Sequence, residues 1–95
     1  MAIGDGPHRS AVRLIIDYIR VCPRIYLDSE RTHHYKWALN EALYLLKTDP
    51  EPPIKIFERE QVKFDSWAHR GKPTDYMFGI VATAYDDLIN LLLNS

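Results

Sequence analysis

The sequence predicts an all-α protein, a single helical domain over residues 1–95 that folds as a small four-helix bundle, up-and-down and antiparallel. Apolar residues recur at steps of three and four in several stretches, which is the spacing of amphipathic helices. The length of 95 residues suits one hydrophobic core and excludes a second beside it. Short connections between the expected helices favour antiparallel neighbours, and together these observations predict the bundle.

The first helix is expected over about residues 8–22. Asp5 and Pro7 precede it as a capping acid and a first-turn proline. Pro23 follows it and lacks the N–H that a continuing helix would need. Its apolar positions share one face and are Ala11, Leu14, Ile15, Tyr18, Ile19 and Cys22.

The second helix is expected over about residues 29–47, with Ser29 as its cap. Its apolar positions keep the same spacing and are Tyr35, Ala38, Leu39, Ala42, Leu43 and Leu46. The run from Thr48 to Pro53 then contains three prolines, so it predicts a stiff connector without regular structure.

Residues 54–70 allow two interpretations. Ile54, Phe57 and Phe64 fit one helical face, whereas Ile54/Ile56 and Val62/Phe64 alternate as strand residues do. We favour a helix, because the segment is rich in good helix formers and has no central turn residue to form a hairpin. Gly71 is then expected in the left-handed conformation that closes a helix.

The last helix is expected over about residues 75–93, with Thr74 as its cap, and it has more apolar residues than one buried stripe needs. Either this helix is central and contacts all the others, or a second apolar face packs against another copy of the chain. We favour the homodimer, with Tyr76, Ile80 and Leu91 in the interface. The longest apolar tract, residues 78–85, is interrupted by Gly79 and Thr83 and is far shorter than the ~20 residues of a membrane span, so no membrane association is expected.

The charge balance and the cysteine count narrow the classes of partner and the cellular location that are expected. Twelve basic and thirteen acidic residues give a formal net charge of −1. The chain therefore lacks the positive field of a nonspecific nucleic-acid binder, and nucleic acid is disfavoured as a partner. A lone cysteine, Cys22, cannot form an internal disulfide, and residues 1–10 lack the pattern of a secretory signal, so a cytoplasmic location is expected.

An arginine stripe lies on the first predicted helix. Arg9, Arg13 and Arg20 project to within roughly 40° of one another at ~100° per residue. Guanidinium groups bind phosphate or carboxylate through two oxygens at once, so the stripe could hold a small anionic ligand such as a nucleotide. The alternative is a solvated polar face on which Asp17 pairs with a neighbouring arginine.

The histidines raise the question of a metal site, because imidazole is a common metal ligand, but no metal or other cofactor is predicted. His33 could meet Asp65 and His69, which are one turn apart, if the second and third helices pack with those ends together. The simpler interpretation is that Asp65 accepts a hydrogen bond from His69 at the surface.

The favoured function is a non-enzymatic protein-protein interaction or regulatory module, similar in kind to an adaptor or an inhibitor. No nucleophile motif or phosphate-binding loop occurs in the sequence, so no enzyme is expected. Trp37 and Tyr44 lie on one face beside the apolar stripe of the second helix, where aromatic residues could contact another protein. In the alternative interpretation, they widen the core stripe.

Overall fold

The computed structural model describes residues 8–21, 26 and 28–94. In this part of the chain, four α-helices are present: α1 (Arg9–Val21), α2 (Ser29–Thr48), α3 (Pro53–Trp67) and α4 (Asp75–Leu93). No strand occurs among the described residues. The predicted all-α class and the four-helix bundle are confirmed.

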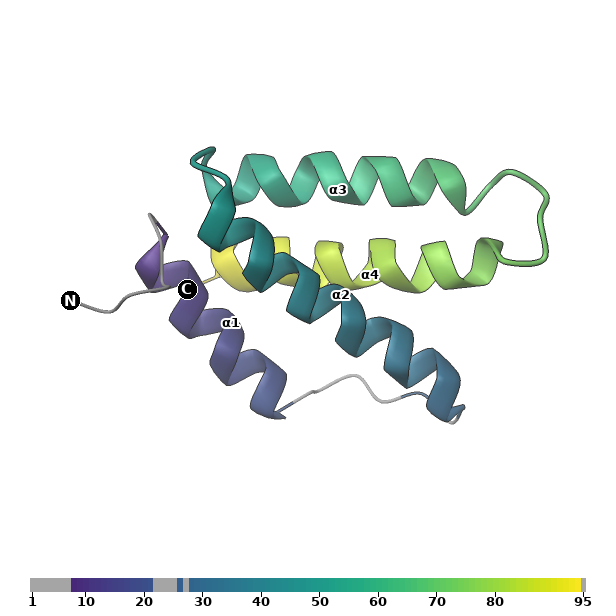
Figure 1. Ribbon diagram of the computed structural model, residues 1–95, viewed down its shortest axis with the longest axis horizontal. Coiled ribbons are helices and arrows are strands. Elements are labelled where there is room, and N and C mark those ends of the chain that lie inside the picture. The colour runs from purple at the N-terminus through teal and green to yellow at the C-terminus, as the bar shows by residue number, and fades with distance from the viewer. Residues whose placement is uncertain (1–7, 22–25, 27, 95) are drawn as a thin grey trace.

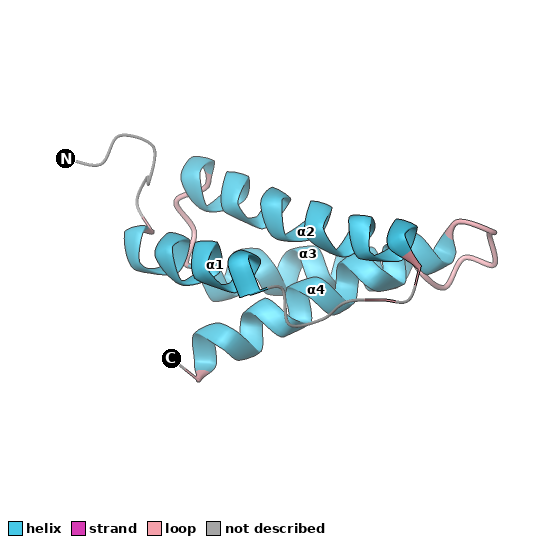
Figure 2. Ribbon diagram, turned by 90° about the horizontal axis from the view of Figure 1, so that it is seen from below, coloured by secondary structure: helices cyan, strands magenta, loops and turns pink. Residues whose placement is uncertain are grey.

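Consecutive helices run in opposite directions, and α3 and α4 lie side by side (Figure 1). α2 crosses this pair at an angle, so that its end lies beside the start of α3 while its start lies apart from α3 (Figure 1). α1 packs chiefly on α2, and it has only a small contact with α4 (Figure 2). The helices α2 and α3 therefore form a V that is closed at their connection and open at the other end.

α1 contributes Val12 and Ile15 to the core, and both are fully buried. It begins and ends within one residue of the predicted bounds. The expected start signals (residues 5–7) and end signals (residues 22–23) lie outside the described residues.

α2 is capped by Asp28, so the prediction of Ser29 as the cap is wrong by one residue. Asp28 has extended backbone, and its carboxylate accepts a hydrogen bond from the Glu30 N–H at 2.8 Å. A carboxylate at this place satisfies a free donor and suits the positive end of the helix. α2 continues one residue beyond the predicted end, to Thr48.

The prediction of a helix rather than a hairpin after the proline run is confirmed, because α3 is helical from Pro53 onward. Its predicted end at Arg70 is wrong, since the helix stops at Trp67. Near this end, two side chains donate hydrogen bonds to backbone carbonyls. His69 Nδ1 donates to the Asp65 carbonyl at 2.8 Å, and Arg70 Nε donates to the Trp67 carbonyl at 3.2 Å. Such bonds compete with the continuing helix.

The turn before α4 is built around Gly71 and Asp75. Gly71 has the predicted left-handed conformation, with φ of 76°, but the C-cap of α3 is Ala68. The Asp75 carboxylate accepts hydrogen bonds from the N–H groups of Gly71 at 2.7 Å and Lys72 at 3.1 Å. Thr74 precedes α4 as expected, yet its side chain makes no capping hydrogen bond.

α4 is the central helix, in contact with each of the other three. Ala84, Tyr85 and Leu88 are fully buried, and Ile80 is only 8% exposed. The expectation that Ile80 stands on a free second face is therefore wrong: α3 lies along α4 and α2 crosses it, so α4 has apolar neighbours on more than one side. Self-association itself stays a prediction.

Measured over its whole length, α4 is also long and apolar enough to cross a membrane. The shorter tract of residues 78–85, on which the sequence-based expectation rests, does not reveal this property. The core helix of a bundle meets the same two criteria. Tyr85 and Leu88 are fully buried in the same chain, as in a core helix. Length and composition alone do not separate these two environments.

A chain of hydrogen bonds joins α1, α2 and α4. The hydroxyl of the fully buried Tyr35 donates to Asp87 Oδ2 at 2.6 Å, and it accepts from the Tyr18 hydroxyl at 3.0 Å. Burial and the Asp87 carboxylate raise the pKa of Tyr35, so its hydroxyl stays protonated and remains a donor.

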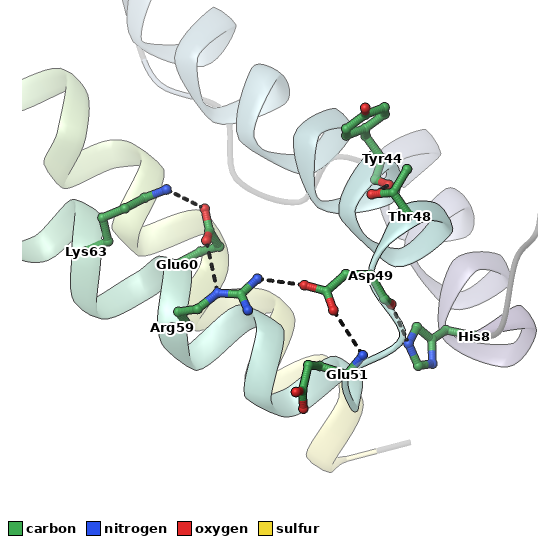
Figure 3. A network of polar contacts seen from close by, with 8 residues as sticks. All are labelled: His8, Tyr44, Thr48, Asp49, Glu51, Arg59, Glu60 and Lys63. Carbon is green, nitrogen blue, oxygen red and sulfur yellow. Dashed lines mark hydrogen bonds and ion pairs between the residues drawn. The ribbon is translucent and has the colours of Figure 1, made fainter.

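Polar contacts fix the closed end of the V (Figure 3). Arg59 on α3 donates to the Asp49 carboxylate at 2.8 Å, and His8 Nε2 donates to the Asp49 carbonyl at 3.0 Å. The Arg59 guanidinium lowers the pKa of Asp49. Glu60 is nearly buried and pairs with Lys63 at 2.8 Å and with Arg59 at 3.4 Å. The Arg59–Asp49 pair holds the end of α2 against α3, and the His8 bond joins the residue before α1 to the same end of α2.

Candidate functional site

Aromatic rings gather where α3 ends and α4 begins. Phe64 and Trp67 are three residues apart on α3, which places them on one face. Their ring centroids are 5.3 Å apart, and Phe78 on α4 lies 5.3 Å from Trp67 and 6.1 Å from Phe64. Trp37 reaches the same cluster from α2, with its ring 6.5 Å from Phe64 and nearly perpendicular to it.

An apolar cleft of about 250 Å³ adjoins this cluster. α2, α3 and α4 all line it, through His33, His34, Trp37, Phe64, Met77, Phe78 and Val81. The side chain of Trp37 is 47% exposed, and that of Trp67 is 37% exposed. Large apolar rings thus face solvent at the open end of the V.

Two cations lie over the rings. Lys63 Nζ is 4.8 Å from the centroid of Phe64, and Arg70 Cζ is 5.1 Å from that of Phe78. Both cations are also within 6 Å of Trp67. The attraction between a cation and a ring face stabilises this arrangement, and it puts positive charge beside the exposed aromatic surface.

Beside the cleft, a hydrogen bond joins α2 to α4. The Tyr76 hydroxyl donates to Glu30 Oε1 at 2.8 Å, and Arg31 lies 5.3 Å from the Tyr76 ring. His34 Nε2 lies 3.7 Å from the same Glu30 oxygen and has no hydrogen-bond partner among the described residues. The bond to Glu30 and burial raise the pKa of Tyr76.

The two aromatic residues predicted on α2 are separated by the structure. Trp37 belongs to the cleft, as described above. Tyr44 is 60% exposed but lies toward the closed end of the V, next to Thr48 (Figure 3). Seven residues along a helix amount to about 10 Å, so the two side chains do not share one contact point.

The residues predicted for self-association also have separate environments. Ile80 lies in the core, and Leu91 is half-buried and packs against the core. Tyr76 is 39% exposed and holds the hydrogen bond to Glu30 on its own chain. The three side chains therefore do not form one exposed apolar patch.

The predicted arginine stripe lies along the exposed side of α1. Arg9, Arg13 and Arg20 are all exposed, and Arg20 lies 4.0 Å from Asp17. A hollow of about 510 Å³ at the start of α1 is lined by Arg9 but by neither of the other two. This hollow therefore does not bring the three arginines together.

The residues considered for a metal do not come together. No group of three or more His, Cys, Asp or Glu residues in the described ranges could hold a metal ion. His33, Asp65 and His69 are all exposed. The expected hydrogen bond from His69 to the Asp65 carboxylate is instead made to the Asp65 backbone carbonyl.

A second groove, of about 490 Å³, runs between α1 and α4. Tyr18 and Asp87 line it together with Leu14, Asn90, Leu91 and Asn94. It therefore borders the hydrogen-bond chain of Tyr35 and brings its outer members close to solvent.

The sequence reasoning missed Phe64, Phe78, Lys63 and Arg70 as site residues. A signal was available in the sequence, because Phe64, Trp67 and Arg70 recur every three residues at the end of α3 and just beyond it. The contribution of α4 could not be obtained in this way, since it depends on how α3 and α4 pair.

Comparison with protein-family models, with curated proteins and with solved structures finds no match to this chain.

Proposed function

We propose that this chain is a non-enzymatic interaction module that binds another protein through the aromatic surface around the cleft. The observation that carries the proposal is the exposure of Trp37 and Trp67 beside that cleft. Tryptophan is enriched among residues that dominate binding energy at protein interfaces, because its large rigid ring removes much apolar area from water. A partner that covers these rings would gain that energy.

The geometry supports this proposal in a second way. The rings are held in place before any partner arrives, by the edge contact of Trp37 with Phe64 and by the packing of Trp67 on Phe78. Preorganised side chains lose little conformational freedom on binding, which favours affinity. The surface is therefore built as a fixed platform rather than as loose side chains.

A matched pair of variants tests the proposal. Trp37→Ala removes a ring from the cleft, whereas Tyr44→Ala removes a more exposed ring from the same helix, away from the cleft. Immobilised wild-type and variant chains are exposed to a lysate of the source cells, and the retained proteins are quantified by mass spectrometry.

We expect a protein that is retained by the wild type and by Tyr44→Ala but lost by Trp37→Ala. Circular dichroism confirms that both variants stay helical. If every retained protein responds equally to both substitutions, the cleft is not the binding surface and the proposal is wrong.

A further inference from the structure

The size of the cleft limits what can occupy it. Its volume of about 250 Å³ is below the ~300–1,000 Å³ of typical small-molecule pockets. Trp37 and Phe64 line it with rings, and Met77 and Val81 from α4 add aliphatic surface. These dimensions and this lining suit a single bulky apolar side chain inserted by a partner.

The charge beside the cleft limits what accompanies that side chain. Lys63 is already paired with Glu60, whereas Arg70 forms no ion pair within the described part of the chain. Arg70 stacks on Trp67 and Phe78 and uses Nε for the Trp67 carbonyl, so its remaining N–H groups are left to bind. A guanidinium held in this way binds a carboxylate through two parallel hydrogen bonds.

We propose that the cleft binds a segment of a partner protein that inserts one bulky apolar side chain beside Trp37 and places a carboxylate against Arg70. This proposal rests on the proposed function. The Arg70 guanidinium lies 5.1 Å from Phe78, a residue of the cleft wall. At about 3.3 Å per extended residue, the acidic residue of the partner falls within about three positions of the anchor.

A stacking nucleic acid fits these observations less well. Bases bind single-stranded sites through open faces of aromatic rings. Here Lys63 and Arg70 lie over Phe64, Trp67 and Phe78, and the rings pack on one another. The acidic peptide instead uses the cleft and the edge of the guanidinium, which the packing leaves open.

Peptide selection tests the proposal. Random peptides displayed on phage are selected on the immobilised full chain, and binders are retained if Trp37→Ala abolishes their binding while Tyr44→Ala does not. We expect the retained peptides to carry Asp or Glu within about three residues of a Leu, Phe or Trp.

Charge variants then measure the contribution of Arg70. We expect Arg70→Glu to weaken binding of a synthetic selected peptide by about tenfold or more, and the neutral Arg70→Gln to weaken it less. Lys55→Glu makes the same charge change at an exposed position of α3 outside the aromatic cluster, and it should alter binding by about twofold or less. The same peptide with Asn and Gln in place of its acids should bind the wild type about as weakly as the acidic peptide binds Arg70→Glu.

The outcomes separate this proposal from the proposed function. If Trp37-dependent peptides show no acidic preference, or bind Arg70→Glu as well as the wild type, the carboxylate partner is wrong and the interaction module stands. If no Trp37-dependent peptide is selected, both are overturned. Trp37-dependent binding of single-stranded oligothymidylate that is tighter than that of the best peptide overturns the peptide partner in favour of a nucleic acid.

Discussion

Removing the hydroxyl from each of two fully buried tyrosines should change the free energy of unfolding in opposite directions. In Tyr35→Phe, the lost hydroxyl donates to a carboxylate and accepts from Tyr18. A hydrogen bond to a charged group contributes about 1.5–3 kcal/mol, and a neutral one about 0.5–1.5 kcal/mol. Tyr18 and Asp87 border the groove between α1 and α4, where water can replace part of the loss. We therefore expect destabilisation by about 2 kcal/mol.

Tyr85→Phe removes a hydroxyl of the other kind. The Tyr85 hydroxyl is buried and has no hydrogen-bond partner among the described residues, and burial raises its pKa. Its desolvation costs about 1–3 kcal/mol that no bond returns. The phenylalanine ring retains the stack on Phe64 and the contact with Phe57. We expect stabilisation by about 1 kcal/mol.

Urea unfolding followed by tryptophan fluorescence measures both changes, with linear extrapolation to water. In thermal melts, the two substitutions should lower and raise Tm by roughly 8–16 °C and 4–8 °C respectively. A double-mutant cycle of Tyr35→Phe with Asp87→Asn should give a coupling energy of at least about 1 kcal/mol. The assignment of the two hydroxyls is refuted if the free energy of unfolding of Tyr35→Phe stays within about 0.5 kcal/mol of the wild type, or if Tyr85→Phe destabilises as much as Tyr35→Phe. Either result would mean that the Tyr35 hydroxyl is not the bonded one or that the Tyr85 hydroxyl is not the unbonded one.

Further predictions concern two glycines, the core position of Ile80 and the ion pair of Asp49. Gly71→Ala should destabilise the fold by about 1 kcal/mol, because the positive φ of Gly71 disfavours any Cβ. Gly79→Ala should stabilise the fold by about 0.5–1 kcal/mol, since the new methyl group meets only an ordinary contact inside α4. Chemical denaturation measures both changes in the free energy of unfolding, and changes of the same sign would contradict this prediction. Ile80→Glu should unfold the chain or lower its free energy of unfolding by about 3 kcal/mol or more, because it places a charge in the core. Circular dichroism and thermal melting measure this effect, and a fully stable variant would contradict the core position of Ile80. The pKa of Asp49 is lowered in the folded state, so its pairing with Arg59 stabilises at neutral pH and is lost as pH falls through that lowered value. Asp49→Asn should therefore cost stability at pH 7 and progressively less below about pH 4, and a pH-independent cost would contradict the pairing.

The positions of the helices could be predicted because the local signals agree with the final packing. Apolar spacing marked the buried face of α2, and the proline run marked the break between α2 and α3, although the structure includes Thr48 in α2 and Pro53 in α3. The cap of α2 could not be chosen from sequence, since Asp28 and Ser29 are adjacent and both are good cap residues. The end of α3 was placed too late because Gly71 looked like its terminator, while the side chains of His69 and Arg70 had already taken carbonyls near its last turn.

The candidate site was harder to predict than the helices. Trp37 was singled out because it lies beside the apolar stripe of α2. Phe64 and Phe78 looked like core residues of their own helices, and nothing in their local pattern shows that they meet. Their meeting depends on the pairing of α3 with α4 and on the angle of α2, which are properties of the whole fold. The environment of Ile80 was misjudged for the same reason.

The attachment of α1 has a consequence for how the molecule opens. α1 is held mainly by α2, through Val12 and Ile15 and through the hydroxyl of Tyr18, while α3 and α4 pack along each other. Regions with few buried contacts open at a lower free energy than the whole protein. α1 can therefore detach while the other three helices remain folded, and this uncovers the face of α2 that includes Tyr35. Proteases and amide hydrogen exchange detect such open forms, so both would detect the loss of α1 as the first step of unfolding.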